Sequence, residues 1–357
     1  FALAKRLKLA KPEIVTVIGG AAVDGKLGQE FSRQVEQMDY IFSGPGLMSF
    51  STFVENLLND DHEANEGIHG VFSKTNEDRW QDEKPKGELF KFQANGKSVA
   101  MMGEDFDIDA DIPLDYGPFL DAFETVFPDG GLKPVLLFET SRGCWWAEKS
   151  VCTFCGLNGV RQVQHWMKPD MALKHIESLF QWVPRCSSFI AVDTIIPPPY
   201  IKDVFPRLKP PPEMKMLYEL RAVIGEEDVE VLNRAGVAAF QPGIEALSTS
   251  TLKLMAKGTT VFQNLLFLKI CSRHPVSLDW NLLICSPGEP EETFEKYRRD
   301  LPLLMHLAPP SGVYPISFVR YSRYFDNAES FGLDLEPQDF YRLTYPFEAR
   351  AGENIAY

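Results

Sequence analysis

The chain has 357 residues, of which 45% are hydrophobic and 24% charged, and its formal net charge at pH 7 is −14. This composition is typical of a globular protein with one large domain or two smaller ones. No apolar run reaches the roughly eighteen residues of a membrane span. The acidic balance argues against a nucleic-acid partner, because phosphate contacts require clustered lysine and arginine. We therefore expect a cytoplasmic protein that binds neither membrane nor nucleic acid.

The first strands and turns predict a doubly wound α/β domain. The segment "PEIVTVIGG" (12–20) has the β-branched run and final glycines of a buried strand and its turn, and "DYIFSGPG" (39–46) repeats the pattern after a helical segment. Ligands of such domains bind at the carboxyl ends of the strands, although these glycines could also serve only to turn the chain. The chain begins at Phe1 within a helix-like stretch, so we expect the natural protein to start upstream.

A polar, acidic stretch from about residue 60 to 130 separates this region from the rest of the chain, and its "ELFKFQANGKSVAMM" predicts a short β excursion. From Pro134 onward, strand and helix candidates alternate. Six such units predict a parallel barrel or part of one, with chemistry on the loops after the strands. The predicted strands are 134–140, 187–192, 215–221, 237–243, 276–285 and 313–319, and the predicted helices are 170–183, 198–208, 226–235, 248–273 and 291–306.

Half of the six cysteines lie in "GCWWAEKSVCTFCGLN", directly after the first of these strands. Such clustering fits a metal site in a reducing compartment better than a disulfide framework. A structural zinc site needs four ligands, and only His165 is near enough to be the fourth. Three thiolates suit a [4Fe-4S] cluster with one open iron. Buried structural cysteines and structural zinc remain alternatives. The other three cysteines stand in apolar surroundings: Cys186, Cys271 and Cys285.

Three clustered cysteines with an aromatic residue before the last one resemble the motif of radical S-adenosylmethionine (SAM) enzymes, although the seven-residue first interval departs from their usual three. Further motifs occur in order along the chain. They are "YELRA", "AGVAAFQPGIEALSTSTLKLMAKG", "DWNLLICSPGEP", "HLAPPSG" and "VRYSRYF". Together they resemble the cobalamin-dependent radical SAM enzymes that mature ribosomal peptides (RiPPs), in particular the polytheonamide-type C-methyltransferases. The first strands are similar to the last part of that family's cobalamin-binding domain.

The resemblance implies an α/β fold in which a truncated Rossmann-like cobalamin-binding domain with its linker (1–115) precedes a partial (βα)6 radical SAM barrel (128–325) and a C-terminal segment (326–357). It also implies three cofactors: a [4Fe-4S] cluster, SAM and cobalamin. The cluster ligands would be Cys144, Cys152 and Cys155.

The resemblance implies further contacts around SAM. Phe154 would pack beside the adenine or act as a hydrophobic plug over the cluster. Asp193 would accept from the SAM amino group or cap the next helix. Glu219 and Arg221 alternate on one strand, so both face one side of it; they would bind the ribose and the SAM carboxylate, or form an ordinary ion pair. Weaker candidates follow the next strands: Gln241, Glu245 and Asn281.

For cobalamin, the resemblance points to two turns. Gly19, Gly20 and Ala21 form the first, and Ser43, Gly44 and Pro45 form the second, where relatives carry glutamate in place of the proline. The chain has no Asp-x-His-x-x-Gly sequence that would supply a histidine to cobalt. Another departure is Cys285, where relatives have glycine; we interpret it as an apolar strand residue.

The implied reaction uses a 5′-deoxyadenosyl radical to activate an unreactive carbon of a ribosomal precursor peptide, which then receives a methyl group from methylcobalamin. The partners would be that peptide and an electron donor such as flavodoxin or ferredoxin. Alternatives are a radical cyclase or rearrangement enzyme on the same scaffold, and a non-catalytic zinc- or cobalamin-binding module. Trp145, Trp146 and Tyr314 would line the space between the cofactors, or simply pack.

Overall fold

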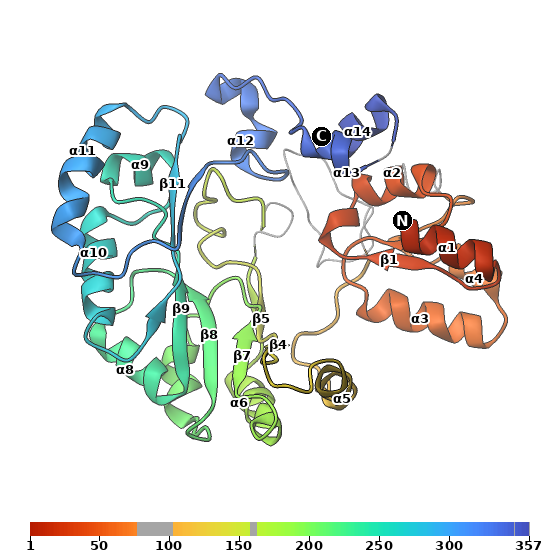
Figure 1. Ribbon diagram of the computed structural model, residues 1–357, viewed down its shortest axis with the longest axis horizontal. Coiled ribbons are helices and arrows are strands. Elements are labelled where there is room, and N and C mark those ends of the chain that lie inside the picture. Colours follow the sequence, from red (N-terminus) through yellow and green to blue (C-terminus); the bar gives the residue numbers. More distant parts are fainter. Residues whose placement is uncertain (77–102, 158–162, 346, 357) are drawn as a thin grey trace. The chain divides into compact units, whose positions relative to one another are not determined.

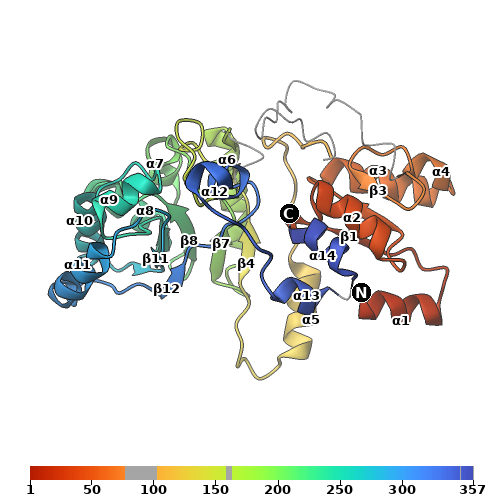
Figure 2. The same cartoon turned by 90° about the horizontal axis from the view of Figure 1, so that it is seen from above.

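The computed structural model (Figures 1 and 2) describes residues 1–76, 103–157, 163–345 and 347–356. The chain forms two compact units. Unit 1 comprises Phe1–Asp107 and Asp334–Tyr357, and unit 2 comprises Ile108–Leu333. The predicted β excursion at 88–102 lies outside the described residues.

Unit 1 is built on a three-stranded sheet in the order β1-β2-β3, with β1 and β2 parallel and β3 antiparallel. Figure 1 shows α2 and α3 on opposite sides of this sheet. A parallel strand, helix, strand unit with helices on both faces is the building block of doubly wound domains, while the complete Rossmann-like fold stays a prediction. The elements are α1 (Ala2–Ala10), β1 (Val17–Gly19), α2 (Lys26–Gln34), β2 (Tyr40–Phe42), α3 (Leu47–Leu58), α4 (His62–Asn65) and β3 (Val71–Phe72).

The C-terminal helices belong to this first unit, an assignment the sequence did not provide. They are α13 (Phe340–Thr344) and α14 (Ala349–Ala356). Ile355 shares a buried cluster with Phe31 of α2, and the Asn354 amide donates to the Glu30 carboxylate over 3.1 Å. The last residues of the chain therefore help to build the core of unit 1.

Unit 2 contains a parallel sheet whose spatial order, β4-β7-β8-β9-β10, follows the chain order. A further parallel pair, β11-β12, is linked to the segment after β9 by an isolated bridge between Glu245 and Leu282. The predicted alternation of strands and helices is thus confirmed as a parallel α/β arrangement; closure into a partial (βα)6 barrel stays a prediction. The strands are β4 (Leu136–Phe138), β7 (Ser188–Ala191), β8 (Lys215–Leu220), β9 (Val237–Pro242), β10 (Ser277–Leu278), β11 (Asn281–Ile284) and β12 (Gly312–Pro315).

Buried side chains of β4, β7, β8 and β9 enter one large core. Phe138, Phe189, Tyr218 and Phe240 are each at most 2% exposed and belong to a single buried cluster. Burying one such ring contributes on the order of 2 kcal/mol, so the sheet is fixed by its helix-facing side and its other face is left for function. The helices of this unit are α5 (Gly117–Val126), α6 (Pro169–Ser178), α7 (Tyr200–Asp203), α8 (Glu226–Arg234), α9 (Thr249–Leu254), α10 (Val261–Cys271), α11 (Glu292–Asp300) and α12 (Arg323–Asp326).

The single helix predicted for 248–273 is wrong, because the structure has two helices there, α9 and α10. Ala256 and Gly258 adopt φ values of 51° and 69°, which a right-handed helix cannot contain. Thr260 then starts α10 with a capping box: its hydroxyl accepts from the Gln263 backbone and the Gln263 side chain accepts from the Thr260 backbone. The break presents Lys257 on a loop.

Across the described part of the chain, no helix combines the length and hydropathy needed to span a membrane.

Candidate functional site

The cysteine loop leaves the sheet between two short antiparallel strands, β5 (Ser141–Arg142) and β6 (His165–Trp166). Gly143 has φ 87°, and a Cβ there would lie 2.5 Å from the Val163 carbonyl oxygen. Only glycine fits that turn. Cys144 follows directly, and all three clustered cysteines have intermediate exposure.

Cys152 and Cys155 are held in place by contacts of Thr153, which lies between them, and of Gly156, which follows them. Thr153 donates its backbone N–H to the Met255 carbonyl over 3.0 Å, and its own carbonyl accepts from the Tyr324 N–H over 3.0 Å. Gly156 lies so close to the next segment that a Cβ would stand 2.2 Å from the Arg320 carbonyl oxygen. The loop is therefore held in place from both sides by contacts within the protein.

Two buried cations lie beside the thiols. Arg221 is 6% exposed and Lys257 is 8% exposed. Burial raises the pKa of the Cys152 thiol, whereas the positive charges of Lys257 and Arg221 oppose that rise. A [4Fe-4S] cluster held by three thiolates carries net negative charge, which becomes favourable in a buried position only with compensating positive charge. The donor set and its charge surroundings fit such a cluster.

Arg221 continues from the end of β8 and keeps part of its guanidinium free. One terminal nitrogen donates to the Lys257 carbonyl over 2.6 Å, while Nε is buried and finds no hydrogen-bond partner among the described residues. The guanidinium stacks on Trp146, with its central carbon 4.1 Å from the ring centroid. Burial lowers the Arg221 pKa, and Cys152 and Cys144 act against that change. This buried Nε–H donor could bind the SAM carboxylate that the sequence analysis assigned to Arg221. The contact itself stays a prediction.

Lys257 is a site residue that the sequence analysis missed. Its ammonium pairs with the Glu245 carboxylate at 2.8 Å, and the two side chains are 10% and 17% exposed. Burial alone would lower the Lys257 pKa, but Glu245 and Cys152 hold the pKa above its ordinary value. The ammonium also lies 5.8 Å from the centroid of the Phe154 ring. The available signal was Gly258, whose place inside an otherwise helical pattern indicated the break.

Glu219 lies on β8 beside Gln241 on β9, with which it is in register. Burial raises the pKa of Glu219 to about 7, and the nearby Glu245 charge adds to the effect. Within the described chain, the Glu219 carboxylate accepts no hydrogen bond and forms no ion pair with Arg221, so the ordinary ion pair is not realised. Asn281 begins β11 and lies opposite Gly312 of β12. The ribose and SAM contacts of these side chains stay predictions.

Asp193 is completely buried after β7 and is fully engaged by the protein. Its carboxylate accepts from the Thr140 N–H over 2.7 Å, from the Thr140 hydroxyl and from the Ser141 hydroxyl over 2.9 Å. Burial raises its pKa to about 6 in spite of these bonds. It does not cap the next helix, which begins after Pro199. Asp193 therefore joins β7 to the start of the cysteine loop; its predicted contact with SAM stays a prediction.

Phe154 packs on an apolar cluster formed by Ala246, Leu252 and Met255, as a hydrophobic plug would. Its predicted place beside the adenine is untested. The interpretation of Cys285 as an apolar strand residue is wrong, because this residue follows β11, is exposed and has φ 63°. That backbone region favours glycine.

In unit 1 the two predicted cobalamin turns lie side by side at the carboxyl ends of β1 and β2. The Gly44 N–H donates to Asp24 over 2.6 Å, and the Gly25 N–H donates to the Ser43 hydroxyl over 2.7 Å. Gly19, Gly20 and Ala21 are exposed, with nothing within 4 Å of a Cβ built on Gly20. The first turn is open to a ligand, whereas the polar groups of the second are used within the protein.

The part of the chain that the structure describes contains no three His, Cys, Asp or Glu side chains that converge on a single metal ion. In a three-cysteine [4Fe-4S] site, each thiolate binds a different iron.

Tyr314 lies on β12 and is 53% exposed.

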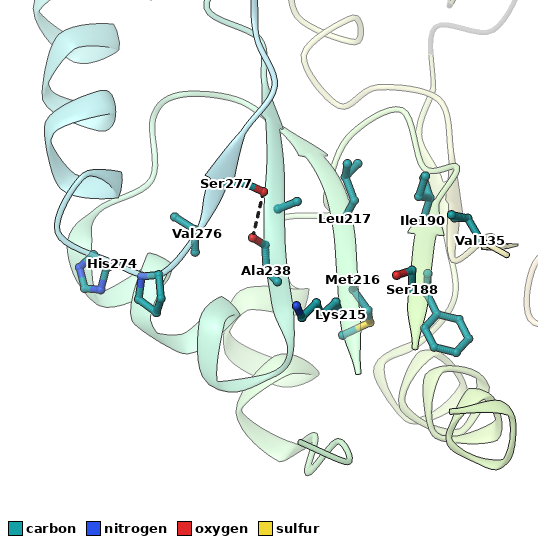
Figure 3. A pocket seen from close by; sticks show the side chains of 13 residues that line it. Val135, Ser188, Ile190, Lys215, Met216, Leu217, Ala238, His274, Val276 and Ser277 are labelled. Carbon is teal, nitrogen blue, oxygen red and sulfur yellow. Dashed lines mark hydrogen bonds between the residues drawn. The ribbon is translucent and has the colours of Figure 1, made fainter. Parts of the chain in front are cut away.

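One cavity lies away from the cysteines. It has a volume of about 630 Å³ and opens at the amino-terminal ends of the strands, where Lys215, Ser188 and Val135 line it (Figure 3). The Ser277 hydroxyl there donates to the Ala238 carbonyl over 3.3 Å. Because chemistry in parallel α/β folds takes place at the opposite ends of the strands, we do not place the cofactors in this cavity.

Residues 138–301 match the family model of the Radical SAM superfamily. The chain therefore contains a radical SAM domain, whose cofactors are a [4Fe-4S] cluster and SAM. None of the curated proteins matches the sequence.

Solved structures show the same fold over nearly the whole chain. The cobalamin-dependent SAM radical enzyme OxsB, with aqua-cobalamin and SAM bound, superposes with a TM-score of 0.63 at 15% identity, covering 94% of this chain and 52% of its own. The radical SAM methyltransferase TsrM from Kitasatospora setae, with tryptophan and a SAM analogue bound, gives 0.59 at 13% identity, covering 94% and 62%. The chain thus spans about half of OxsB and three-fifths of TsrM.

Proposed function

We propose that the chain is a cobalamin-dependent radical SAM C-methyltransferase that acts on a ribosomal precursor peptide. The observation that carries the proposal is the three-cysteine loop after β4, bordered by the buried cations Arg221 and Lys257. When bound, the cluster supplies the electron that splits SAM, and cobalamin supplies the methyl group. The protein's own side chains position these groups.

Three cysteines and two cations have separate tasks in this proposal. Cys144, Cys152 and Cys155 hold the cluster, and the cations balance its charge. Arg221 has the unused Nε donor for the SAM carboxylate, and Glu219 has an unused carboxylate for the ribose hydroxyls. Gln241 and Asn281 are further candidates for polar contacts.

Cobalamin binding is supported by unit 1 and by the structural neighbours. The exposed turn at Gly19, Gly20 and Ala21 follows a parallel strand, the position where α/β domains bind nucleotide-like groups. OxsB and TsrM have both been solved with cobalamin bound. The second turn, at Ser43, Gly44 and Pro45, would contribute shape rather than free polar groups.

The radical SAM step is tested by anaerobic reconstitution. We expect four irons per chain and release of 5′-deoxyadenosine from SAM after reduction. Cys144→Ser, Cys152→Ser and Cys155→Ser should each lose both. The matched control is Cys285→Ser, since Cys285 is exposed and lies outside the loop; it should keep both. Equal iron content in all four variants would refute the assignment of the cluster ligands.

The methyl transfer is tested with methyl-labelled SAM, added cobalamin and candidate precursor peptides. Mass spectrometry should find the label on a peptide carbon, and omission of cobalamin should abolish it. A peptide that loses only hydrogen would contradict methylation and indicate a cyclase on the same scaffold.

A further inference from the structure

A second, smaller cavity lies next to the cysteine loop. Its volume is about 380 Å³, and it is enclosed by Trp145 and Lys149 of that loop, by the segment after β7 and by the segment after β8. None of the predicted cofactor contacts except Arg221 lines it. The volume lies within the range of ligand-binding cavities.

Most of the cavity wall is aliphatic. The contributing side chains come from the segment after β7, including α7, and from the end of β8 with the segment after it; they are Ile195, Ile196, Ile201, Leu220, Val223 and Ile224. Aliphatic walls of this kind bind apolar groups by removing their surface from water. Val223 remains 44% exposed, so part of this apolar surface is still available to a ligand.

The charged groups of the lining are mostly positive. Three cations, Lys149, Lys202 and Arg221, face one carboxylate, Asp228. The Asp228 carboxylate already accepts from the Gly225 N–H over 3.0 Å at the start of α8. Lys149 and Lys202 form no ion pair with any other described residue. In a chain with a net charge of −14, this local excess of positive charge marks a place that favours an anion.

The two adjacent tryptophans have different surroundings. Trp146 is fixed: its Nε1 donates to the Ala256 carbonyl over 3.2 Å and its ring lies against Gly258. Trp145 instead lines the cavity, with the Lys149 ammonium 5.7 Å from its ring centroid. Trp145 therefore connects the cavity wall to the cysteine loop.

We propose that this cavity binds an aliphatic residue of the peptide substrate together with an adjacent acidic residue. The aliphatic side chain enters the wall, and the carboxylate lies between Lys149 and Lys202. The peptide nature of the ligand rests on the proposed function, whereas the preference for an acidic, aliphatic segment rests on the lining alone. Binding at this place would hold the substrate beside the loop that carries the cluster.

The test is calorimetric binding of three blocked tetrapeptides, Ala-Leu-Glu-Ala, Ala-Leu-Gln-Ala and Ala-Leu-Lys-Ala, to the reconstituted enzyme. We expect the glutamate peptide to bind at least about tenfold more tightly than the lysine peptide, and the difference to shrink with salt. Lys149→Ala and Lys202→Ala should each weaken the glutamate peptide about threefold, the size of an exposed ion pair. Ile201→Glu, which places a carboxylate in the wall, should abolish its binding.

Lys253→Ala is the matched control, because Lys253 is an exposed lysine on α9 outside the cavity; it should bind the peptide like the wild type. Iron content and 5′-deoxyadenosine release verify that each variant is folded and loaded. Equal binding of the three peptides, or unchanged binding in both lysine variants, would overturn the proposal. If the wild type binds the glutamate peptide selectively but cleaves no SAM, only the proposed function fails.

Discussion

The Trp146 ring occupies the space that a side chain on Gly258 would need. A Cβ built on Gly258 would lie 2.1 Å from the indole, and Gly258 itself has φ 69°. This contact joins the cysteine loop to the break between α9 and α10, more than a hundred residues further along the chain. It also positions Lys257, the neighbour of Gly258, beside the thiols.

Gly258→Ala should therefore disturb both stability and cluster binding. Gly130→Ala is the matched control, since Gly130 has φ 64° but nothing within 4 Å of its Cβ position. The control should lose about 1 kcal/mol through the left-handed backbone, and Gly258→Ala about 1–3 kcal/mol more through overpacking. Urea unfolding and iron content after reconstitution measure the two effects. Equal losses in both variants would show that the indole moves aside without cost.

The buried pair of Lys257 and Glu245 should behave as a unit. Lys257→Met leaves a buried carboxylate without its partner and should lower the free energy of unfolding by about 3–5 kcal/mol. Adding Glu245→Gln removes that charge and should recover most of the loss. Lys253 is an exposed lysine on α9. Lys253→Met should therefore change the free energy of unfolding by less than about 0.5 kcal/mol. Additive losses in the double variant would contradict the coupling.

Much of unit 2 could be predicted because its signals are local. The β-branched runs gave the parallel strands in their order, and the acidic first turn of α8 with Gly236 after it gave that helix nearly to the residue. The three cysteines were visible as a motif. Their place after the first strand of the sheet followed from the same alternation.

One of the two buried cations of the site, Lys257, could not be predicted in the same way. Lys257 appears in the sequence as one lysine of a helical stretch. Its partner Glu245 lies on the other side of a helix, and its neighbours Ala256 and Gly258 contact Trp146, which is distant in sequence. Asp193 was recognised as important, yet its hydrogen bonds to Thr140 and Ser141 arise from strand pairing between β4 and β7. Such roles depend on tertiary contacts rather than on local patterns.

Cys285 should be replaceable by glycine with a gain in stability. Its φ of 63° costs a residue with a Cβ about 1 kcal/mol, which glycine does not lose. Cys285→Gly should therefore raise the free energy of unfolding by about that amount. Cys285→Ala keeps the Cβ and should leave it unchanged. If both variants gain equally, the thiol rather than the backbone is the source of the effect.

Asp193 should act as a positioning residue at the start of the cysteine loop. Asp193→Ala leaves the N–H and the hydroxyl of Thr140 buried without their acceptor, whereas the Ser141 hydroxyl keeps the Ile195 carbonyl at 3.4 Å, and we expect a loss of about 3 kcal/mol in urea unfolding. Asp203→Ala, at an exposed position on α7, is the control. Wild-type stability combined with weaker SAM binding would instead make Asp193 a ligand contact.

Glu219 should make the stability of the protein depend on pH near neutrality. Its folded pKa of about 7 lies above the ordinary value of 4.5, so the folded protein binds this proton more tightly than the unfolded chain does. Ionised Glu219 therefore costs stability above pH 7, and this cost disappears as the pH falls toward 4.5. Glu219→Gln should be more stable than the wild type by about 1–2 kcal/mol at pH 8, a value reduced for partial exposure, and the difference should shrink toward pH 5.

The same ionisation controls the proposed ribose contact. The ionised carboxylate is the better hydrogen-bond acceptor. The SAM affinity of the wild type should therefore rise with pH through about 7 and level off above it. Glu219→Gln should bind SAM more weakly, and its affinity should not change with pH in this range. Calorimetry of SAM binding between pH 5.5 and 8.5, in buffers of different ionisation enthalpy, measures both affinity and proton release. A variant that retains the wild-type pH profile would assign the titration to another group, and a variant with wild-type affinity at pH 8 would remove Glu219 from the SAM site.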